Sequence, residues 1–172
     1  VLSLVKQEAE SFSGSNLVFA EEVIEAARHI EVQILGDGHS CIHLFERDCS
    51  FQRNFQKFIE FCPAPNLKTQ TKEKLYNYAI VLCQSVGYKG LGTVEFLVDK
   101  NEKIYFMEVN PRVQVEHTIT EELTGIDLIR AQINVFCGLS IQDQKLSEVQ
   151  ISGKRASIQA RLNMESYDNK IQ

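Results

Sequence analysis

The sequence predicts an α+β fold in which helices flank an antiparallel β-sheet. Two pairs of strand-like runs predict the sheet, and a short polar turn separates the members of each pair: residues 29–35 with 41–45, and residues 93–98 with 104–109. Apolar residues at helical spacing predict helices at 71–86 and 120–137 that cover this sheet. At 172 residues, the chain is long enough for one domain with a core, or for a piece of a larger domain.

The chain opens with two predicted elements. Residues 2–12 have the pattern of a short amphipathic helix, which Ser13-Gly14-Ser15 ends. Residues 17–24, LVFAEEVI, have the composition of a strand. We therefore expect a helix and then a strand before the first hairpin.

The first hairpin follows directly. Residues 29–35 alternate with the period of a strand, and Gly36-Asp37-Gly38 predicts the turn to a partner strand at 41–45. Residues 46–57, ERDCSFQRNFQK, are dense in charge, and we expect them to form a polar loop.

Two longer helices lie beyond this loop. The first covers 71–86 and ends at Gly87, with an expected apolar stripe of Leu75, Ala79, Leu82 and Val86. The second begins at Thr120, a candidate N-cap, and runs to about Cys137. Its expected buried face is Leu123, Ile126, Ile129, Ile133 and Phe136. Residues 154–162 predict one further strand.

The second hairpin carries the residues that first suggest a function. A loop of two or four residues centred on Lys100-Asn101 would place Glu95 opposite Phe106, with Glu108 one diagonal step away on the same face. Diagonal neighbours lie about 7–8 Å apart, so two glutamate side chains can bring their carboxylates together. An odd-numbered loop would instead put the two glutamates on opposite faces and remove the argument.

Two carboxylates on one face repel each other unless a positive charge lies between them. Carboxylate and amide oxygens favour hard cations, so Glu95, Glu108 and Asn110 are candidate Mg²⁺ ligands. If the chain stays extended past Pro111, the same face continues with Arg112, Gln114 and Glu116. A solvated strand face or a surface salt bridge would explain any one of these residues alone. Five polar residues at alternate positions from Glu108 to Glu116 favour a functional site.

Composition excludes several classes of function. The net charge of −5 gives no basic surface for nucleic acid, and no apolar run is long enough to cross a membrane. The five cysteines are odd in number and show no C-x-x-C spacing, so we expect free thiols in a reducing compartment rather than disulfides or zinc ligands: Cys41, Cys49, Cys62, Cys83 and Cys137.

Four sequence blocks resemble a known family. Residues 92–128, which begin GTVEF and continue as FMEVNPRVQVEHTITEELTGIDL, are similar to the ATP-grasp core of biotin carboxylase, the ATP-dependent component of biotin-dependent carboxylases. RHIEVQILGDG, LFERDCSFQRNFQK and CPAP resemble the preceding blocks of the family in the same order. The resemblance extends from about Asn16 to Leu162.

The resemblance implies a division of the chain and a cellular setting. Residues 1–172 would be a partial ATP-grasp domain: 1–30 the end of the lid and the adenine hinge, 31–137 the catalytic core, and 138–172 the start of the C-terminal region. The chain is expected to be part of a larger protein, cytoplasmic or, in a eukaryote, in the mitochondrial matrix. The implied partners are a biotin carboxyl carrier domain, a carboxyltransferase domain or subunit, and other copies of the parent protein. No nucleic acid or membrane is expected.

The implied reaction uses ATP, Mg²⁺ (or Mn²⁺), bicarbonate and carrier-bound biotin. ATP phosphorylates bicarbonate to carboxyphosphate, and the carboxyl group then passes to biotin. By resemblance, the metal ligands are Glu95, Glu108 and Asn110, and the residues that bind nucleotide, phosphate or bicarbonate are Glu21, Ile24, His29, Gln52, Lys57, Glu95, Glu108, Gln114 and Val115.

The catalytic residues implied are Lys57, Arg112 and Glu116. Arg112 would hold bicarbonate and later the biotin oxygen, because a guanidinium suits planar oxyanions. Glu116 would deprotonate bicarbonate as general base, while Lys57, Gln114 and the main chain of Val115 hold it.

Several departures bear on activity. Phe55 stands where the family has a histidine that contacts nucleotide, and Asn54 replaces a usual arginine. Nothing matches the glycine-rich lid, and the family's later arginine is expected beyond Gln172. We therefore expect little carboxylation from the isolated chain. Two alternatives stay open: another ATP-grasp ligase of the carbamoyl phosphate synthase type, and a degenerate homologue that binds nucleotide without catalysis.

Overall fold

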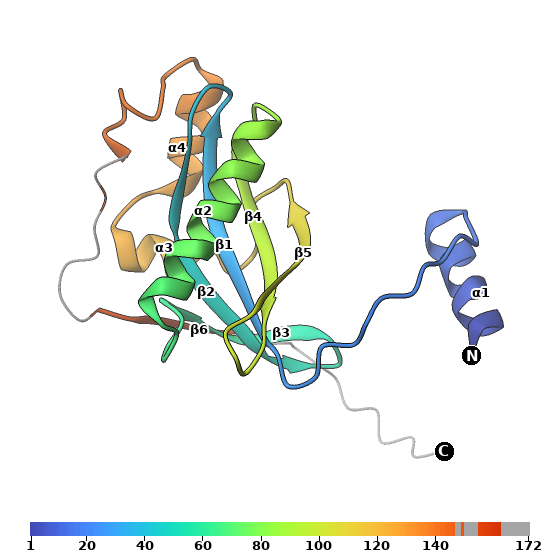
Figure 1. Cartoon of the computed structure of the whole chain (residues 1–172). Helices are drawn as coiled ribbons and strands as arrows, with labels where there is room; N and C mark the ends of the chain where they lie inside the picture. The colour runs from blue at the N-terminus through green and yellow to red at the C-terminus, as the bar shows by residue number, and fades with distance from the viewer. Residues whose placement is uncertain (147–148, 150–154, 163–172) are drawn as a thin grey trace.

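The computed structural model describes residues 1–146, 149 and 155–162 of the chain (Figure 1). Its elements are α1 (Leu2–Ser13), β1 (Arg28–Asp37), β2 (Cys41–Arg53), β3 (Gln56–Cys62), α2 (Thr69–Ser85), β4 (Lys89–Val98), β5 (Ile104–Asn110), α3 (His117–Thr124), α4 (Leu128–Phe136) and β6 (Ser157–Ala160).

All the strands form one antiparallel sheet in the order β5-β4-β1-β2-β3-β6. Helix α2 lies on one face of this sheet, while α3 and α4 lie on the other (Figure 1). The α+β prediction, with helices flanking an antiparallel sheet, is therefore confirmed. Both predicted hairpins are present, and the strand predicted at 154–162 is β6 over its described part.

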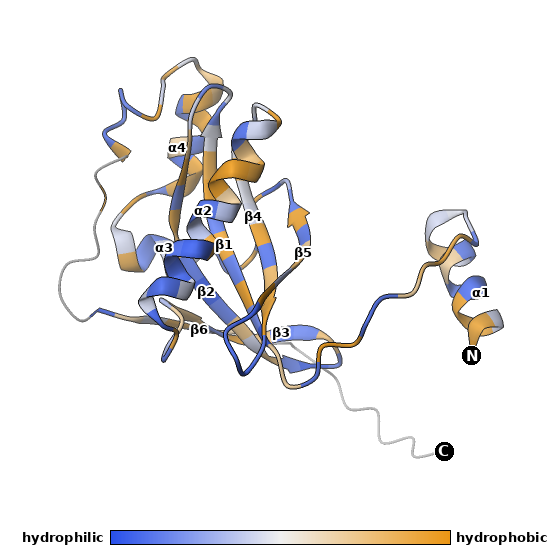
Figure 2. Ribbon diagram, in the orientation of Figure 1, coloured by the Kyte–Doolittle hydropathy of each residue, from blue (hydrophilic) through white to orange (hydrophobic). Residues whose placement is uncertain are grey.

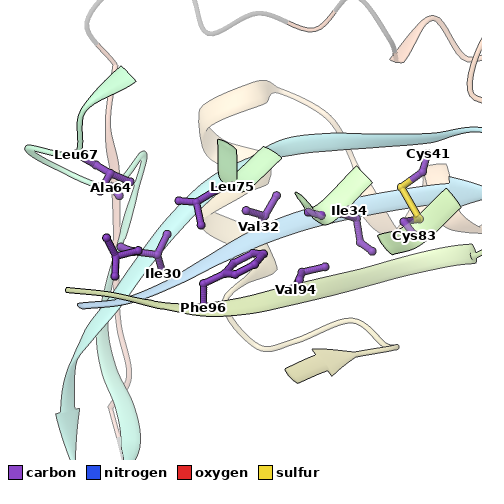
Figure 3. Packing of buried hydrophobic residues seen from close by; sticks show 12 residues of the cluster. Ile30, Val32, Ile34, Cys41, Ala64, Leu67, Leu75, Cys83, Val94 and Phe96 are labelled. Atoms are coloured by element: carbon purple, nitrogen blue, oxygen red, sulfur yellow. A yellow bond between two sulfur atoms is a disulfide. The ribbon is translucent and has the colours of Figure 1, made fainter. Parts of the chain in front are cut away.

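The face under α2 is the larger apolar layer. Alternate residues of β1, Ile30, Val32 and Ile34, point toward this helix and pack with Val94 and Phe96 of β4 (Figure 3). The helix contributes Thr71, Leu75, Ala79 and Cys83, four residues apart, as its buried side. The predicted stripe was therefore partly wrong, because Leu82 and Val86 are 36% and 69% exposed.

The opposite face changes character along its length. Near α4 it is apolar: Leu35, Leu44 and Leu91 pack against Leu128, Ala131 and Val135. Further along β1, the residues that share the parity of Leu35 are Gln33, Glu31 and His29. Figure 2 accordingly shows hydrophilic residues interleaved with hydrophobic ones along β1 and β2. The apolar end fixes α4, and the polar end is left for the site described below.

The segment before β1 differs from prediction. Helix α1 forms as expected but has no buried residue, and residues 14–27 that connect it to the sheet form no strand (Figure 1). The strand predicted at 17–24 is therefore wrong. Its apolar side chains do not pack into the described core: Leu17, Phe19 and Val23 are more than 80% exposed, at 86%, 86% and 82%. Strand composition alone does not supply a partner strand.

The predicted polar loop at 46–57 is also wrong. Strand β2 runs on to Arg53, turns at Asn54 and Phe55, and returns as β3. Both turn residues have positive φ, 51° and 60°, which suits a two-residue hairpin turn. The charges misled the prediction because charged residues of this segment, including Glu46 and Arg47, face inward and pair there rather than in solvent.

The helix predicted at 120–137 is two helices. Gly125 has φ 74° and ends α3, and the carboxylate of Asp127 accepts a hydrogen bond from Arg130 N, which caps α4. Thr120 is therefore not an N-cap but a buried residue inside α3. Because α4 starts afresh at Leu128, its buried side differs from the predicted one: Ile129, Ile133 and Phe136 are at least 36% exposed.

The cysteines are not all free. Cys41 of β2 and Cys83 of α2 form a disulfide across 42 residues of sequence, which corrects the expectation of free thiols (Figure 3). The pairing could not be predicted because no spacing motif links the two positions. Cys49, Cys62 and Cys137 are free as expected. The cysteine count therefore no longer argues for a reducing compartment. Separately, the helices among the described residues include none that could cross a bilayer.

Candidate functional site

A cavity of about 690 Å³ opens on the polar end of the sheet. Its walls come from β1, the β2–β3 hairpin, β4, β5, the segment before α3, and the end of β6. The residues that line it are His29, Gln52, Phe55, Gln56, Lys57, Glu95, Met107, Glu108, Asn110, Arg112, Gln114, Val115, Glu116 and Arg161. All three predicted catalytic residues and all three predicted metal ligands are among them.

The register between β4 and β5 differs from prediction but leads to the same face. The loop at 99–103 has an odd number of residues, and Phe96 pairs with Phe106. The register then shifts at Met107, so that Glu95 pairs directly with Glu108. A one-residue bulge of this kind reverses which side chains share a face. The odd loop and the bulge cancel, and the two glutamates lie on one face after all.

Past Asn110 the chain leaves the sheet. The expectation of a continuous extended ribbon is wrong, because residues 111–116 form bends and turns that lead into α3. The predicted alternation holds only in part: Val113 packs into the apolar layer under α4, whereas Arg112, Gln114 and Glu116 line the cavity. Val115, which was expected to face the same way as Val113, also lines the cavity and is 63% exposed.

Lys57 is the centre of the cluster. Its ammonium donates to carboxylates from three elements, Glu31, Glu95 and Glu116, and the last two contacts are each 2.8 Å. The side chain of Lys57 is only 12% exposed, and those of its partners are 0–4% exposed. In such surroundings charge–charge attraction is much stronger than in water.

These contacts shift the pKa of each group. Burial by itself would lower the pKa of Lys57, but the surrounding carboxylates, Glu31 foremost, raise it above its ordinary value. Burial would raise the pKa of Glu95, yet hydrogen bonds from His29, Lys57 and Gln114 hold it far below the usual range. The charge and hydrogen bond of Lys57 likewise outweigh burial and lower the pKa of Glu116. Lys57, Glu95 and Glu116 are therefore ionised at neutral pH.

Glu31 and Arg47 lie beneath the cavity surface and stabilise this cluster, and neither was predicted from the sequence to be a site residue. Arg47 is fully buried and binds Glu31 through Nε, and its Nη1 donates to Gln33 and Thr120 at 2.7 and 2.9 Å. Glu31 thus joins two cations, with Arg47 on one oxygen and Lys57 on the other. The period-2 pattern of His29, Glu31 and Gln33 was the available signal, because three polar residues share one parity of an otherwise apolar strand.

His29 and Gln52 form one edge of the cavity. The side-chain nitrogen of Gln52 donates to His29 Nδ1 at 2.8 Å and to the carbonyl of Cys49 at 3.0 Å. His29 therefore carries its proton on Nε2, which faces Glu95. The arrangement fixes the imidazole beside the carboxylate that was predicted to hold a metal.

The predicted metal ligands lie together. The amide nitrogen of Asn110 reaches Glu95 at 2.9 Å and Glu108 at 3.2 Å, so it bridges the two carboxylates. An oxygen-rich set of two carboxylates and one amide suits Mg²⁺ once the amide turns its oxygen inward. Two further groups have ligand atoms within 4.8 Å of one another, His29 with Glu31 and Glu95, and Glu31 with Cys49 and Glu116. In both, Lys57 already supplies a positive charge.

Two groups are poised for an additional anionic or polar partner. Gln114 is 9% exposed and donates to Glu95 at 3.0 Å, while its oxygen has no partner among the described residues. Buried polar atoms are nearly always bonded, so this oxygen is suited to accept a hydrogen bond from a ligand. Arg112 is exposed, and among the described residues its guanidinium donates to the Val113 carbonyl at 3.2 Å and to Asn110 Oδ1 at 3.5 Å.

Arg161 is a cavity residue that was not predicted. It follows β6 and donates from Nη2 to Glu116 at 2.8 Å. In the sequence, Arg161 was part of the strand predicted at 154–162 and was given no role in the site. The signal was weak, because the approach depends on β6 pairing with β3, from which it is separated by about a hundred residues.

The expected adenine contacts are elsewhere. Glu21 and Ile24 lie in the irregular segment before β1 and do not line the cavity. Phe55, at the tip of the β2–β3 hairpin, is 98% exposed and forms part of the cavity rim. A histidine there could offer a hydrogen bond to a ligand, whereas a phenyl ring offers only an apolar surface.

Comparison with known proteins identifies a family and several relatives of this chain. Residues 1–144 match the family model described as "Carbamoyl-phosphate synthase L chain, ATP binding domain". The chain is 47% identical over 159 residues to a pyruvate carboxylase from Aspergillus terreus, and the match covers 92% of this chain but 13% of that protein. The chain thus spans about an eighth of the length of this relative.

Solved structures agree. A pyruvate carboxylase from Rhizobium etli with the allosteric activator acetyl coenzyme A superposes with a TM-score of 0.86 at 43% identity, over 93% of this chain and 15% of that one. A biotin carboxylase from Campylobacter jejuni, in a β,γ-ATP complex, has a TM-score of 0.86 at 42% identity, over 93% of this chain and 35% of that one. These neighbours confirm the predicted ATP-grasp core, and the nature of the relatives favours biotin carboxylase over the carbamoyl phosphate synthase alternative.

Proposed function

This chain belongs to the family of carbamoyl-phosphate synthase L chain ATP-binding domains, and we propose that it is the core of the biotin carboxylase component of a larger biotin-dependent carboxylase. The reaction proposed is ATP-dependent carboxylation of carrier-bound biotin by bicarbonate. The partners proposed are a carboxyl carrier domain, a carboxyltransferase and other copies of the parent protein. Pyruvate carboxylases and biotin carboxylases are its relatives, which supports this assignment.

The observation that carries the proposal is the Lys57 cluster. Three carboxylates from β1, β4 and the start of α3 converge on this one ammonium in a cavity whose rim also carries Arg112 and Arg161. Small anions are attracted to such cations, and the buried carboxylates supply a base and metal ligands beside them. Few functions other than chemistry on an anionic substrate need this combination.

The nucleotide would lie along the His29 edge. Glu95, Glu108 and Asn110 are proposed to hold Mg²⁺, which when bound neutralises charge on the ATP phosphates. His29 and Gln52 are proposed to contact the nucleotide, because their hydrogen bonds fix them beside Glu95. Glu21 and Ile24 are proposed for adenine on the family resemblance alone.

Bicarbonate would lie between Lys57 and Arg112. Glu116 is proposed to take its proton, because its carboxylate lies 2.8 Å from the Lys57 ammonium, beside the place where bicarbonate would bind. Gln114 would accept a hydrogen bond through its free oxygen, and the main chain of Val115 would complete the pocket. The deprotonated bicarbonate oxygen then attacks the γ-phosphorus of ATP, forming carboxyphosphate and releasing ADP.

The test is ADP release by the full-length protein that carries this chain, with Mg²⁺-ATP and bicarbonate, with and without free biotin. We expect biotin to stimulate release and Arg112→Ala to abolish that stimulation. Arg130→Ala, on the exposed side of α4, is the matched control and should behave like the wild type. ADP release that depends on bicarbonate but does not change when biotin is added would favour an ATP-grasp ligase of the carbamoyl phosphate synthase type instead.

One observation favours a second candidate. The exposed Phe55 at the rim cannot donate a hydrogen bond, which fits a degenerate homologue that binds nucleotide without turnover. Nucleotide binding with no ADP release, not restored by Phe55→His, would establish that alternative.

A further inference from the structure

Glu60 is a buried acid whose one side-chain hydrogen bond within the described part of the chain leads into the cavity. It lies in β3 and is 0% exposed. One oxygen accepts a hydrogen bond from Arg161 Nε at 2.8 Å, and the other has no partner among the described residues. A buried carboxylate with an unused oxygen is costly. Burial accordingly raises the pKa of Glu60, although Arg161 opposes that shift.

Arg161 is held at three points. Its main-chain nitrogen donates to the Phe58 carbonyl at 2.9 Å, its Nε binds Glu60, and its Nη2 reaches Glu116 at 2.8 Å. Because the guanidinium is planar and rigid, fixing the Nε edge on Glu60 also fixes the direction of the Nη2 edge. That edge faces the carboxylate we assign as general base. The side chain of Arg161 is 26% exposed, so without its anchor it is free to turn toward solvent.

A second buried glutamate shows what a purely structural acid looks like in this fold. Glu46 is also 0% exposed, but both of its oxygens are used. They bind the main chain of Ala64 at 3.1 Å, Lys72 at 2.6 Å and the hydroxyl of Tyr76, all on the side of α2. Glu46 thus ties α2 and the loop before it to the sheet. Glu60, by contrast, has Arg161 as its single side-chain partner in the described ranges 1–146, 149 and 155–162.

We propose that Glu60 is a positioning residue that holds Arg161 against Glu116 and so orders the cation at the anion-binding end of the cavity. The inference rests on the proposed function in that it takes Glu116 as the general base. Glu60 does not touch the substrate in this proposal and acts only through Arg161.

The decisive variant is Glu60→Met in the full-length protein. Methionine has a similar size and no acceptor. Removing one partner of a buried ion pair is costly when the other charge stays buried, but the side chain of Arg161 is 26% exposed and can turn toward solvent, so no buried unpaired charge is left. We expect stability to be retained while the kcat for bicarbonate-dependent ATP cleavage falls about tenfold or more, since misplaced groups cost rate. Glu60→Gln keeps an acceptor for Arg161 Nε and should retain most of the activity.

Two comparisons separate positioning from stability. Glu46→Met, the matched control, should lower stability but leave the turnover of the folded protein unchanged. In an Arg161→Met background, Glu60→Met should cause no further loss, because the two residues act as one unit. Independent, multiplicative losses from Glu60→Met and Arg161→Met would overturn the proposal, as would equal activity of Glu60→Met and the wild type.

A failure of the proposed function would be recognised separately, as a wild type without bicarbonate-dependent ATP cleavage. The crystal structure of Glu60→Met then decides the inference. Arg161 turned away from Glu116 would support the anchoring role, and Arg161 unmoved on Glu116 would refute it.

Discussion

At the scale of single residues, the site depends on acids that stay ionised although they are buried. Glu95 and Glu116 are 3% and 1% exposed, a setting that normally favours the neutral form. The hydrogen bond of His29 and then that of Lys57 reverse this preference for Glu95, and Lys57 reverses it for Glu116, so one ammonium acts on both acids. Removal of one member therefore leaves the others with unbalanced charge.

Glu116→Gln is expected to suppress bicarbonate-dependent ATP cleavage by about 100-fold or more, the usual worth of a general base. Nucleotide binding should change little, because the metal ligands and His29 are untouched. ADP release and nucleotide titration of the same preparation measure both quantities. Glu122→Gln, an exposed substitution on α3, is the control. Equal loss of binding and cleavage would contradict the role of Glu116.

At the scale of elements, the sequence predicted strands and helices wherever one side of the element was plainly apolar. The β1–β2 and β4–β5 hairpins and helix α2 were predicted for that reason. The β2–β3 hairpin was missed because Glu46 and Arg47 look like solvent-facing charges, and only their partners, Tyr76, Lys72 and Glu31, show that they are buried. Such pairs join residues far apart in sequence, so local patterns do not contain them.

The same distinction applies to the site. Glu95, Glu108, Asn110, Lys57 and Glu116 were predicted because the family motifs and strand parity identify them. Arg161 was missed because its place depends on how β6 pairs with β3. Local patterns predict the residues carried by one hairpin, whereas the residues that close the site from other elements require the assembled sheet.

The disulfide between Cys41 and Cys83 gives a prediction at this scale. It fastens α2 to the start of β2 and closes a loop across 42 residues. Reduction, or Cys83→Ser, should lower the free energy of unfolding by about 2 to 4 kcal/mol, chiefly by freeing the unfolded chain. Urea denaturation with and without reductant measures the difference. Cys137→Ser, at an exposed free thiol, should have no effect. Equal stability in both conditions would show that the link is not formed.

At the scale of the whole molecule, the ionised cluster makes stability depend on pH. Glu95 and Glu116 have folded-state pKa values below the ordinary glutamate value of 4.5. Their stabilising contribution is therefore complete above that value and is lost as the pH falls toward their folded-state pKa values. Since the two acids belong to β4 and to the start of α3, acid should loosen both sides of the cavity.

We expect the free energy of unfolding to decrease steeply between about pH 5 and pH 3. Glu95→Gln should make the curve shallower, because an amide does not titrate. Urea unfolding at a series of pH values tests this, with Glu73→Gln on the exposed side of α2 as control. A slope that Glu95→Gln leaves unchanged would place the acid sensitivity in other groups.

The odd loop after β4 and the bulge at Met107 have a consequence for how this hairpin can change during evolution. Each irregularity alone would turn Glu108 and Asn110 to the far side of the sheet. A single-residue insertion or deletion in the turn would therefore remove Glu108 and Asn110 from the cavity, unless a second one within β5 restores the alternation. Homologues with turns of other lengths should accordingly differ by two residues at a time, or should have gained or lost the bulge in the same lineage.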